Sequence, residues 1–416
     1  MLSTAARAYA RCWPALLAWF LAGWTARLLL LRFAASVGNE LPLVGQLILP
    51  LAVIARLASY VAMFLVLRAA LPNVADADPP RADGTRMGFL ARWGAAISAA
   101  ILPFFVVYAA WGMISEDGKD YAAAALDQAD LWGGGSSNAL DVVVDVWSLG
   151  IVVLAFAGRW LLQRFSSRLP RWTAVVSAYL EAVWVLVALL VIRELLAGVP
   201  AWFATRRMFA PVVDAVAMWR EDLGWFRWLG DAFTWLMTQL GDVVFQPLAW
   251  VALAAVVYVG ARSRASAAAP NARVARARAA VTARWARLPR WVRTAITTVT
   301  GGFQERWLPI AGAVRLIWAA GPLTLGGFLL AYALAHAAGE WLFVAVIRVL
   351  GPHEFLFWTA VDDPANLLVV ALVVPVQLAL VAATYDTALG RSTATAPAGE
   401  SITTAEGGTP AAADRT

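Results

Sequence analysis

Long runs of apolar residues recur along the chain, separated by short stretches in which polar and charged residues gather. A helix that crosses the apolar core of a bilayer needs about 20 such residues. By this measure we predict eight spans, at residues 13–35, 42–67, 93–114, 142–163, 172–195, 243–260, 321–350 and 367–389. The pattern therefore predicts an all-α fold, a polytopic integral membrane helix bundle of about eight transmembrane helices.

A different periodicity occupies residues 212–240, where apolar side chains return every three or four positions and charged residues fill the gaps. This pattern predicts an amphipathic helix pair, interrupted at Gly224 or Gly230, within an outer element at 200–242. Such an element lies along the headgroups at the outer interface. A lid over a cavity, a docking surface for a partner and a passive surface helix would all give the same pattern.

The loop at 261–306 is the most basic part of the chain, and residues 276–293 alone hold six arginines and two tryptophans. Apolar residues recur there at helical spacing while arginines take other positions, which is typical of a helix lying on an anionic inner leaflet. We predict lipid contact rather than nucleic-acid binding, because nucleic acid would not require the apolar face. The predicted surface anchors are Arg284, Trp285, Arg287, Arg290 and Trp291.

Composition agrees with the span pattern, since 61% of the 416 residues are hydrophobic and only 14% are charged. Cys12 is the single cysteine, so no intramolecular disulfide can form. We found no Cys/His cluster and no motif of a nucleophile, metal or nucleotide site, so we predict no metal and no cofactor. The expected protein is not an enzyme.

Charge orients the predicted spans. With eight spans and the N-terminus inside, the inner segments carry 21 arginines and the outer segments carry five basic residues. This bias follows the positive-inside rule in every loop. We therefore expect a multi-pass protein of the plasma (inner) membrane, with both termini cytoplasmic.

Four odd-numbered spans start with Arg followed by Trp or a nearby Trp, and three even-numbered spans carry a proline at a similar position. One interpretation is four duplicated hairpins arranged as parallel repeats. The other is that arginine and tryptophan simply mark an inner membrane interface. Pro50, Pro247 and Pro375 are expected to kink their helices, which creates room for a cavity or hinge.

Ionisable side chains at membrane depth are costly and commonly mark a binding site. The deepest are Arg56, Glu181, His336 and Glu340, and His336 and Glu340 share a helical face because they are four residues apart. Arg27 and Asp145 lie nearer the outer face. These six are the candidate intramembrane charged or binding residues. The alternative is structural, with Arg56 paired to Glu181 or Glu340 merely to neutralise buried charge.

Small residues in span seven predict close helix approach and a place near the bundle centre. We divide the chain into 1–260 with the first six spans, the basic loop 261–306, the last two spans at 307–390, and a disordered cytoplasmic tail at 391–416. The expected function is a carrier or channel-like protein for a small solute or lipid. The alternatives are a non-transporting membrane scaffold that binds a partner membrane protein, and an integral-membrane transferase.

Overall fold

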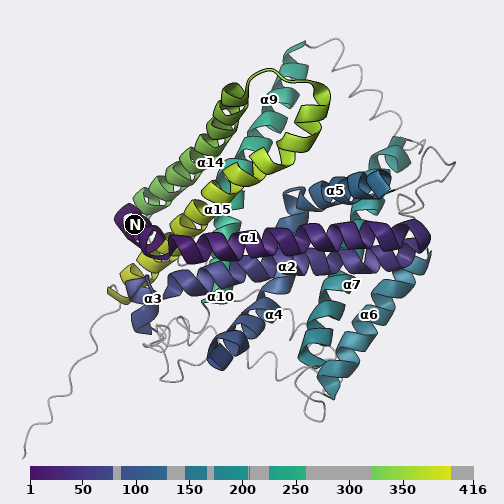
Figure 1. The fold of residues 1–416 in the computed structure, drawn as a ribbon, viewed down its shortest axis with the longest axis horizontal. Coiled ribbons are helices and arrows are strands. Elements are labelled where there is room, and N and C mark those ends of the chain that lie inside the picture. The colour runs from purple at the N-terminus through teal and green to yellow at the C-terminus, as the bar shows by residue number, and fades with distance from the viewer. Residues whose placement is uncertain are drawn as a thin grey trace, which may run out of the picture.

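A computed structural model describes residues 1–77, 86–128, 146–165, 173–204, 206, 224–258 and 321–394. The described residues are helical, with no strand among them. The helices are α1 (Leu2–Glu40), α2 (Pro42–Arg68), α3 (Pro72–Ala77), α4 (Arg86–Ala110), α5 (Met113–Gln128), α6 (Val146–Arg164), α7 (Thr173–Ala204), α9 (Gly224–Leu240), η2 (Gly241–Phe245), α10 (Gln246–Val257), α14 (Pro322–Leu350) and α15 (Phe355–Ala394). Figure 1 shows their arrangement.

Six segments of the described chain are long and apolar enough to cross a membrane. They are Leu2–Glu40, Pro42–Arg68, Val175–Val199, Trp228–Val257, Pro322–Leu350 and Phe355–Ser392. A seventh results if the bent pair Ala96–Ala110 and Met113–Gln128 counts as one span, and Gly150–Leu162 is a shorter apolar helix. The chain is therefore a multi-pass helical membrane protein with six or seven such segments, and each of the eight predicted spans overlaps a helix.

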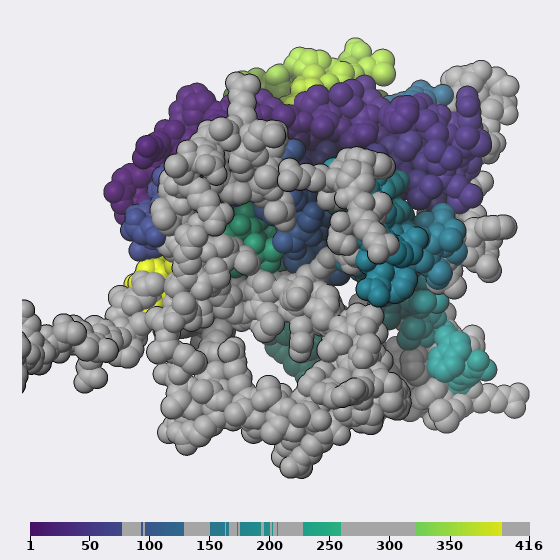
Figure 2. Space-filling view, turned by 90° about the horizontal axis from the view of Figure 1, so that it is seen from below, coloured from purple at the N-terminus to yellow at the C-terminus, as the bar shows by residue number. Residues whose placement is uncertain are grey.

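The first two helices form a long antiparallel hairpin that runs across the view in Figure 1 and along the upper face in Figure 2. Only Leu41 separates α1 from α2, and Pro42 at the start of α2 suits a first helical turn because its missing N–H has no partner there. Gly23 permits the close approach, since a Cβ atom there would lie 2.2 Å from the Ser59 Cβ. The Ser59 hydroxyl also donates to the Trp19 carbonyl at 2.8 Å.

A sharp turn joins α4 to α5, which are bent by 79°. Gly112 makes the turn with φ +73°, a conformation that residues with a Cβ rarely adopt. After the turn α5 packs along the C-terminal half of α1, where the Asn39 amide donates to the Ala125 carbonyl at 3.2 Å. The segment expected to be an outer loop thus contains a packed helix that carries acidic residues back to α1.

α9, η2 and α10 follow one another without a break from Gly224 to Val257. The interruption expected at Gly230 is absent, and the stretch Trp228–Val257 is long and apolar enough to cross a membrane. Among the described residues, the helix thus does not end at 242 but continues into the bundle, whereas residues 205 and 207–223 of the predicted outer element lie outside the described residues. The five-residue π-helix at Gly241–Phe245 lies directly before Pro247, where proline cannot donate a regular helical hydrogen bond.

The apolar core lies between α2, α4, α10 and α15. α14 contributes only Phe328 and Tyr332 to it: 11% of its most apolar stretch is buried, against 61% for α15. The expectation that span seven is central is thus wrong for the described bundle. Its small residues find only one partner helix, because Gly339 packs on Val373 while Gly326 and Gly327 face open space.

The helix pairing does not follow four equivalent hairpins. Spans one and two pair as α1 and α2, and spans seven and eight pair as α14 and α15. In between, α6 pairs with α7, and α4 packs on α7 and α10, so spans three and four are not partners. The shared Arg–Trp starts therefore do not correspond to repeated hairpin units among the described helices.

Several chain segments expected on the inner side meet at one end of the bundle. The Thr384 hydroxyl donates to the Met1 sulfur at 3.3 Å, and the Asn73 amide donates to the Asp386 carboxylate at 3.0 Å. At the same end the Tyr258 hydroxyl donates to the Phe64 carbonyl at 2.6 Å. The start of α1 and the last turns of α15 thus lie together.

Some sequence predictions lie outside the described residues. These are the basic loop 261–306 with its anchors Arg284, Trp285, Arg287, Arg290 and Trp291, the candidate Asp145, and the tail beyond 394. Residues 391–394, expected in the tail, form the last turn of α15.

Candidate functional site

An ionic cluster joins α1, α2, α4 and α5. Asp117 of α5 is buried and accepts a hydrogen bond from Arg27 Nε at 2.8 Å, and it forms an ion pair with the same guanidinium. The Tyr108 hydroxyl donates to the second oxygen of Asp117. Arg27 also binds Asp120, which is half exposed. Together with Arg56, the positive charges of two arginines in this cluster balance the negative charges of the two aspartates.

Arg56 of α2 completes this cluster. Its Nη1 lies 3.8 Å from Asp117 Oδ1 and donates to the Tyr108 hydroxyl at 3.4 Å, while its Nε donates to the Tyr60 hydroxyl at 3.3 Å. The Arg56 guanidinium also lies 5.8 Å from the centre of the Tyr108 ring, within cation–π range. The side chain is 16% exposed, so it is held from one side and reaches open space on the other.

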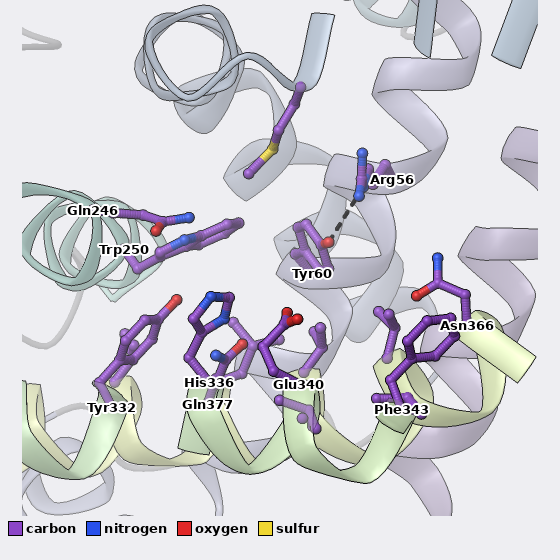
Figure 3. A pocket seen from close by; sticks show the side chains of 18 of the residues that line it. Arg56, Tyr60, Gln246, Trp250, Tyr332, His336, Glu340, Phe343, Asn366 and Gln377 are labelled. Atoms are coloured by element: carbon purple, nitrogen blue, oxygen red, sulfur yellow. Dashed lines mark hydrogen bonds between the residues drawn. The ribbon is translucent and has the colours of Figure 1, made fainter. Parts of the chain in front are cut away.

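That open space is a cavity of about 520 Å³ between α2, α10, α14 and α15 (Figure 3). Apolar residues of α15, such as Val373, and the rings of Trp250 and Phe343 form much of its wall. Polar groups other than Arg56, Tyr60 and Tyr332 also reach it, namely Gln246, His336, Glu340, Asp362, Asn366 and Gln377. Cavities of this size and mixed lining are typical of small-molecule sites.

His336 and Glu340 occupy the α14 wall. They lie one turn apart and point into the cavity toward α2, with Glu340 facing Tyr60 and Arg56 (Figure 3). Among the described residues, no hydrogen bond or ion pair involves either side chain. The structure thus brings three of the candidates, Arg56, His336 and Glu340, to one cavity.

The other candidates lie elsewhere. Glu181 of α7 is buried beside Arg159 of α6, with Oε2 3.4 Å from Arg159 Nε, and it does not line the cavity. Arg27 is one layer behind the cavity, joined to Arg56 through Asp117. Arg56 therefore pairs with Asp117 and not, as the structural alternative expected, with Glu181 or Glu340. Glu181 pairs with Arg159 instead.

Sequence reasoning missed Asp117, because its position outside the predicted spans made it look like an ordinary loop carboxylate. It also missed the amides Gln246 and Gln377, which stand beside or near the kinking prolines Pro247 and Pro375. Amide side chains inside apolar runs carry a desolvation cost. An amide in an apolar run near a proline therefore could have predicted a position in a cavity wall.

No protein-family model, curated protein or solved structure matches this chain. Nor do the described residues contain a group of three or more His, Cys, Asp or Glu side chains arranged to hold a metal ion. What the cavity can do must therefore be judged from its own groups. Amides, phenols, an imidazole and carboxylates bind a solute by hydrogen bonds and charge.

Proposed function

We propose that the chain is a carrier or channel-like protein that binds a small solute or lipid in the cavity between α2, α10, α14 and α15. The observation that carries the proposal is a space of about 520 Å³ with polar groups in the middle of membrane-length helices. Transporters bind substrates near the middle of the bilayer, at helices whose regular hydrogen bonding is interrupted.

The desolvation cost of the cavity wall supports this assignment. Gln246 and Gln377 are half-buried, and no hydrogen bond to another described residue satisfies either amide. A polar group away from water costs free energy unless a partner compensates it. Water or a solute in the cavity would supply that partner, whereas a bundle that serves only as a scaffold gains nothing from the arrangement.

The helix architecture also supports a means of opening. Pro247 follows the π-helical turn of η2, and Pro375 lies within α15 beside cavity residues. Kinks and π-turns are the points at which long helices bend. α14, which packs mainly on α15, forms a wall that can move with little loss of core packing.

For the topology we propose eight crossings in the plasma (inner) membrane with both termini cytoplasmic. The meeting of Met1 with Thr384 at one end supports an even number of crossings. The arginine bias between the two sides supports the cytoplasmic assignment of that end. We also propose contact of the basic loop with anionic lipid, and binding and passage of the solute rather than catalysis.

A thiol-accessibility experiment tests passage without knowledge of the solute. Gln377→Cys is introduced into a Cys12→Ala chain, and a membrane-impermeant thiol reagent is applied to right-side-out and inside-out vesicles. Passage requires that the cavity open to each side, so labelling from both sides is expected. Leu330→Cys is the control, because Leu330 is 62% exposed on α14 but does not line the cavity.

Labelling of the Gln377→Cys chain from one side only would indicate a binding pocket without passage. Absence of labelling from both sides, with a correctly inserted protein, would favour the scaffold. Either result contradicts the proposed function.

A further inference from the structure

Among the described residues that line the cavity, Arg56, His336, Glu340 and Asp362 are of basic or acidic type, and the two carboxylates are not matched. The positive charge of Arg56 is already matched by Asp117 at 3.8 Å within the balanced cluster of two arginines and two aspartates. Its Nε and Nη1 groups are also occupied by the hydroxyls of Tyr60 and Tyr108. An anionic solute would therefore meet a guanidinium that is already neutralised.

The remaining carboxylates, Glu340 on α14 and Asp362 on α15, face the same cavity from adjacent helices. Within the described ranges, neither carboxylate has a hydrogen bond or an ion pair. Both side chains are exposed along the open side of the cavity. An ionised carboxylate at membrane depth needs a positive partner or water. Among the described residues, no arginine or lysine pairs with either carboxylate, and the other basic group on this wall is the His336 imidazole, one turn from Glu340.

Aromatic rings from α2, α10 and α14 form another part of the wall. Tyr60 and Trp250 meet edge to face with their centres 5.2 Å apart, and Tyr332 stands beside them (Figure 3). The face of an aromatic ring attracts a cation, and the attraction grows when the cation leaves water. Carboxylates beside aromatic rings favour an alkylated ammonium over an anion or a metal ion.

We propose that the solute is an organic cation, an amine or quaternary ammonium group on a small apolar body. This inference rests on the proposed function, because it names the class of solute that the same cavity takes. The ammonium group lies between Glu340 and the rings of Tyr60 and Trp250. Its apolar part packs on the valine-rich face of α15, which includes Val370 and Val373.

Three probes of nearly equal shape and different charge test this proposal on the full chain in lipid nanodiscs. Benzyltrimethylammonium is the cation, dimethylbenzylcarbinol is its neutral isostere, and phenylmethanesulfonate is an anion of similar size. Isothermal titration calorimetry measures each affinity, with protein-free nanodiscs as the blank. The cation should bind at least about tenfold more tightly than either of the others, since a tenfold difference requires only 1.4 kcal/mol.

Two variants locate the selectivity. Glu340→Gln keeps the size of the side chain and removes its charge, so it should weaken cation binding about tenfold or more and leave the neutral probe unchanged. Glu40→Gln is the matched control, because Glu40 is an exposed glutamate at the end of α1, away from the cavity. It should leave all three affinities unchanged.

The proposal is overturned if the anion or the neutral isostere binds as tightly as the cation. It is also overturned if Glu340→Gln leaves cation affinity intact, or if no probe binds above the blank. Labelling of the Gln377→Cys chain from both sides together with any of these results would leave passage standing and remove only the cationic solute. Charge-selective binding without labelling from both sides would leave the cationic solute standing and remove passage.

Discussion

The charged side chains in the two walls of the cavity differ in whether the fold provides them with partners. On the α2 wall, Arg56 is bound by Tyr60, Tyr108 and Asp117, and the cluster continues to Arg27. On the α14 wall, Glu340 points into the cavity, and no contact to another described residue satisfies it. A charge that the fold has already neutralised stabilises the structure, whereas a charge left facing a cavity is available to a solute.

The same contrast holds for packing. More than half of the apolar stretch of α2 is buried, and Gly23 and Gly45 bring it against α1. α14 packs mainly on α15 and keeps most of its apolar surface exposed, as suits a helix in contact with lipid. Substitutions on the two helices should therefore differ in their effect on the free energy of unfolding.

Asp117→Asn should have the largest effect. The substitution leaves Arg27 and Arg56 without their shared carboxylate, and removing one partner of a buried pair costs about 3–5 kcal/mol. Unfolding by sodium dodecyl sulfate, followed by circular dichroism, measures the loss. Asp127→Asn on the exposed side of α5 is the control and should change stability little. Equal stability of the two variants would show that the cluster does not hold α5.

Glu181→Gln should come next, with a loss of about 2–3 kcal/mol. The effect is smaller because Arg159 stands at 3.4 Å from one carboxylate oxygen and the pair involves two helices rather than four. The same unfolding assay measures it. Binding of benzyltrimethylammonium should stay unchanged, since the pair lies outside the cavity, and a weakened affinity would return Glu181 to the binding site.

Gly45→Ala should destabilise the protein by about 1–3 kcal/mol, because its Cβ would lie 2.6 Å from Gly38 Cα and 2.8 Å from the Ala34 carbonyl oxygen. Gly326→Ala on α14 is the matched substitution, in open space. It should leave stability unchanged or raise it by up to about 1 kcal/mol, since alanine favours helix. Comparable losses in the two variants would mean that α14 packs as tightly as α2.

Glu340→Gln should have the smallest effect on unfolding, within about 0.5 kcal/mol, because no described contact depends on its charge. The thermal unfolding midpoint in nanodiscs checks this expectation. Its effect should appear in cation binding instead. A loss as large as that of Asp117→Asn would show that Glu340 is a structural residue.

Much of the fold was predictable because it depends on local features. Apolar runs located the membrane-length helices, although not α5, and the proline after η2 and the one inside α15 marked the helix sections beside the cavity. The continuity of the helix through Gly230 and past residue 242 was not predictable in the same way. Gly230 weakens a helix by only about 1 kcal/mol, and packing in the bundle overrides such a preference.

Within the candidate site, the sequence gathered Arg56, His336 and Glu340 by their cost in an apolar environment, and all three line the cavity. It could not separate Glu181 from them, since burial cost is the same for a carboxylate in a structural pair and for one in a binding site. Nor could it select Asp117, which lies after a turn made by Gly112 and returns to α1 only because α4 and α5 are bent by 79°.

The sequence by itself determined the class of the protein and the segments that become membrane-length helices, because transfer of an apolar run into lipid depends only on its length and composition. Only the tertiary structure decided which charges meet. Partners on different helices depend on how each helix is rotated and on which neighbours it packs against. Those choices paired Arg56 with Asp117 and left Glu340 facing the cavity.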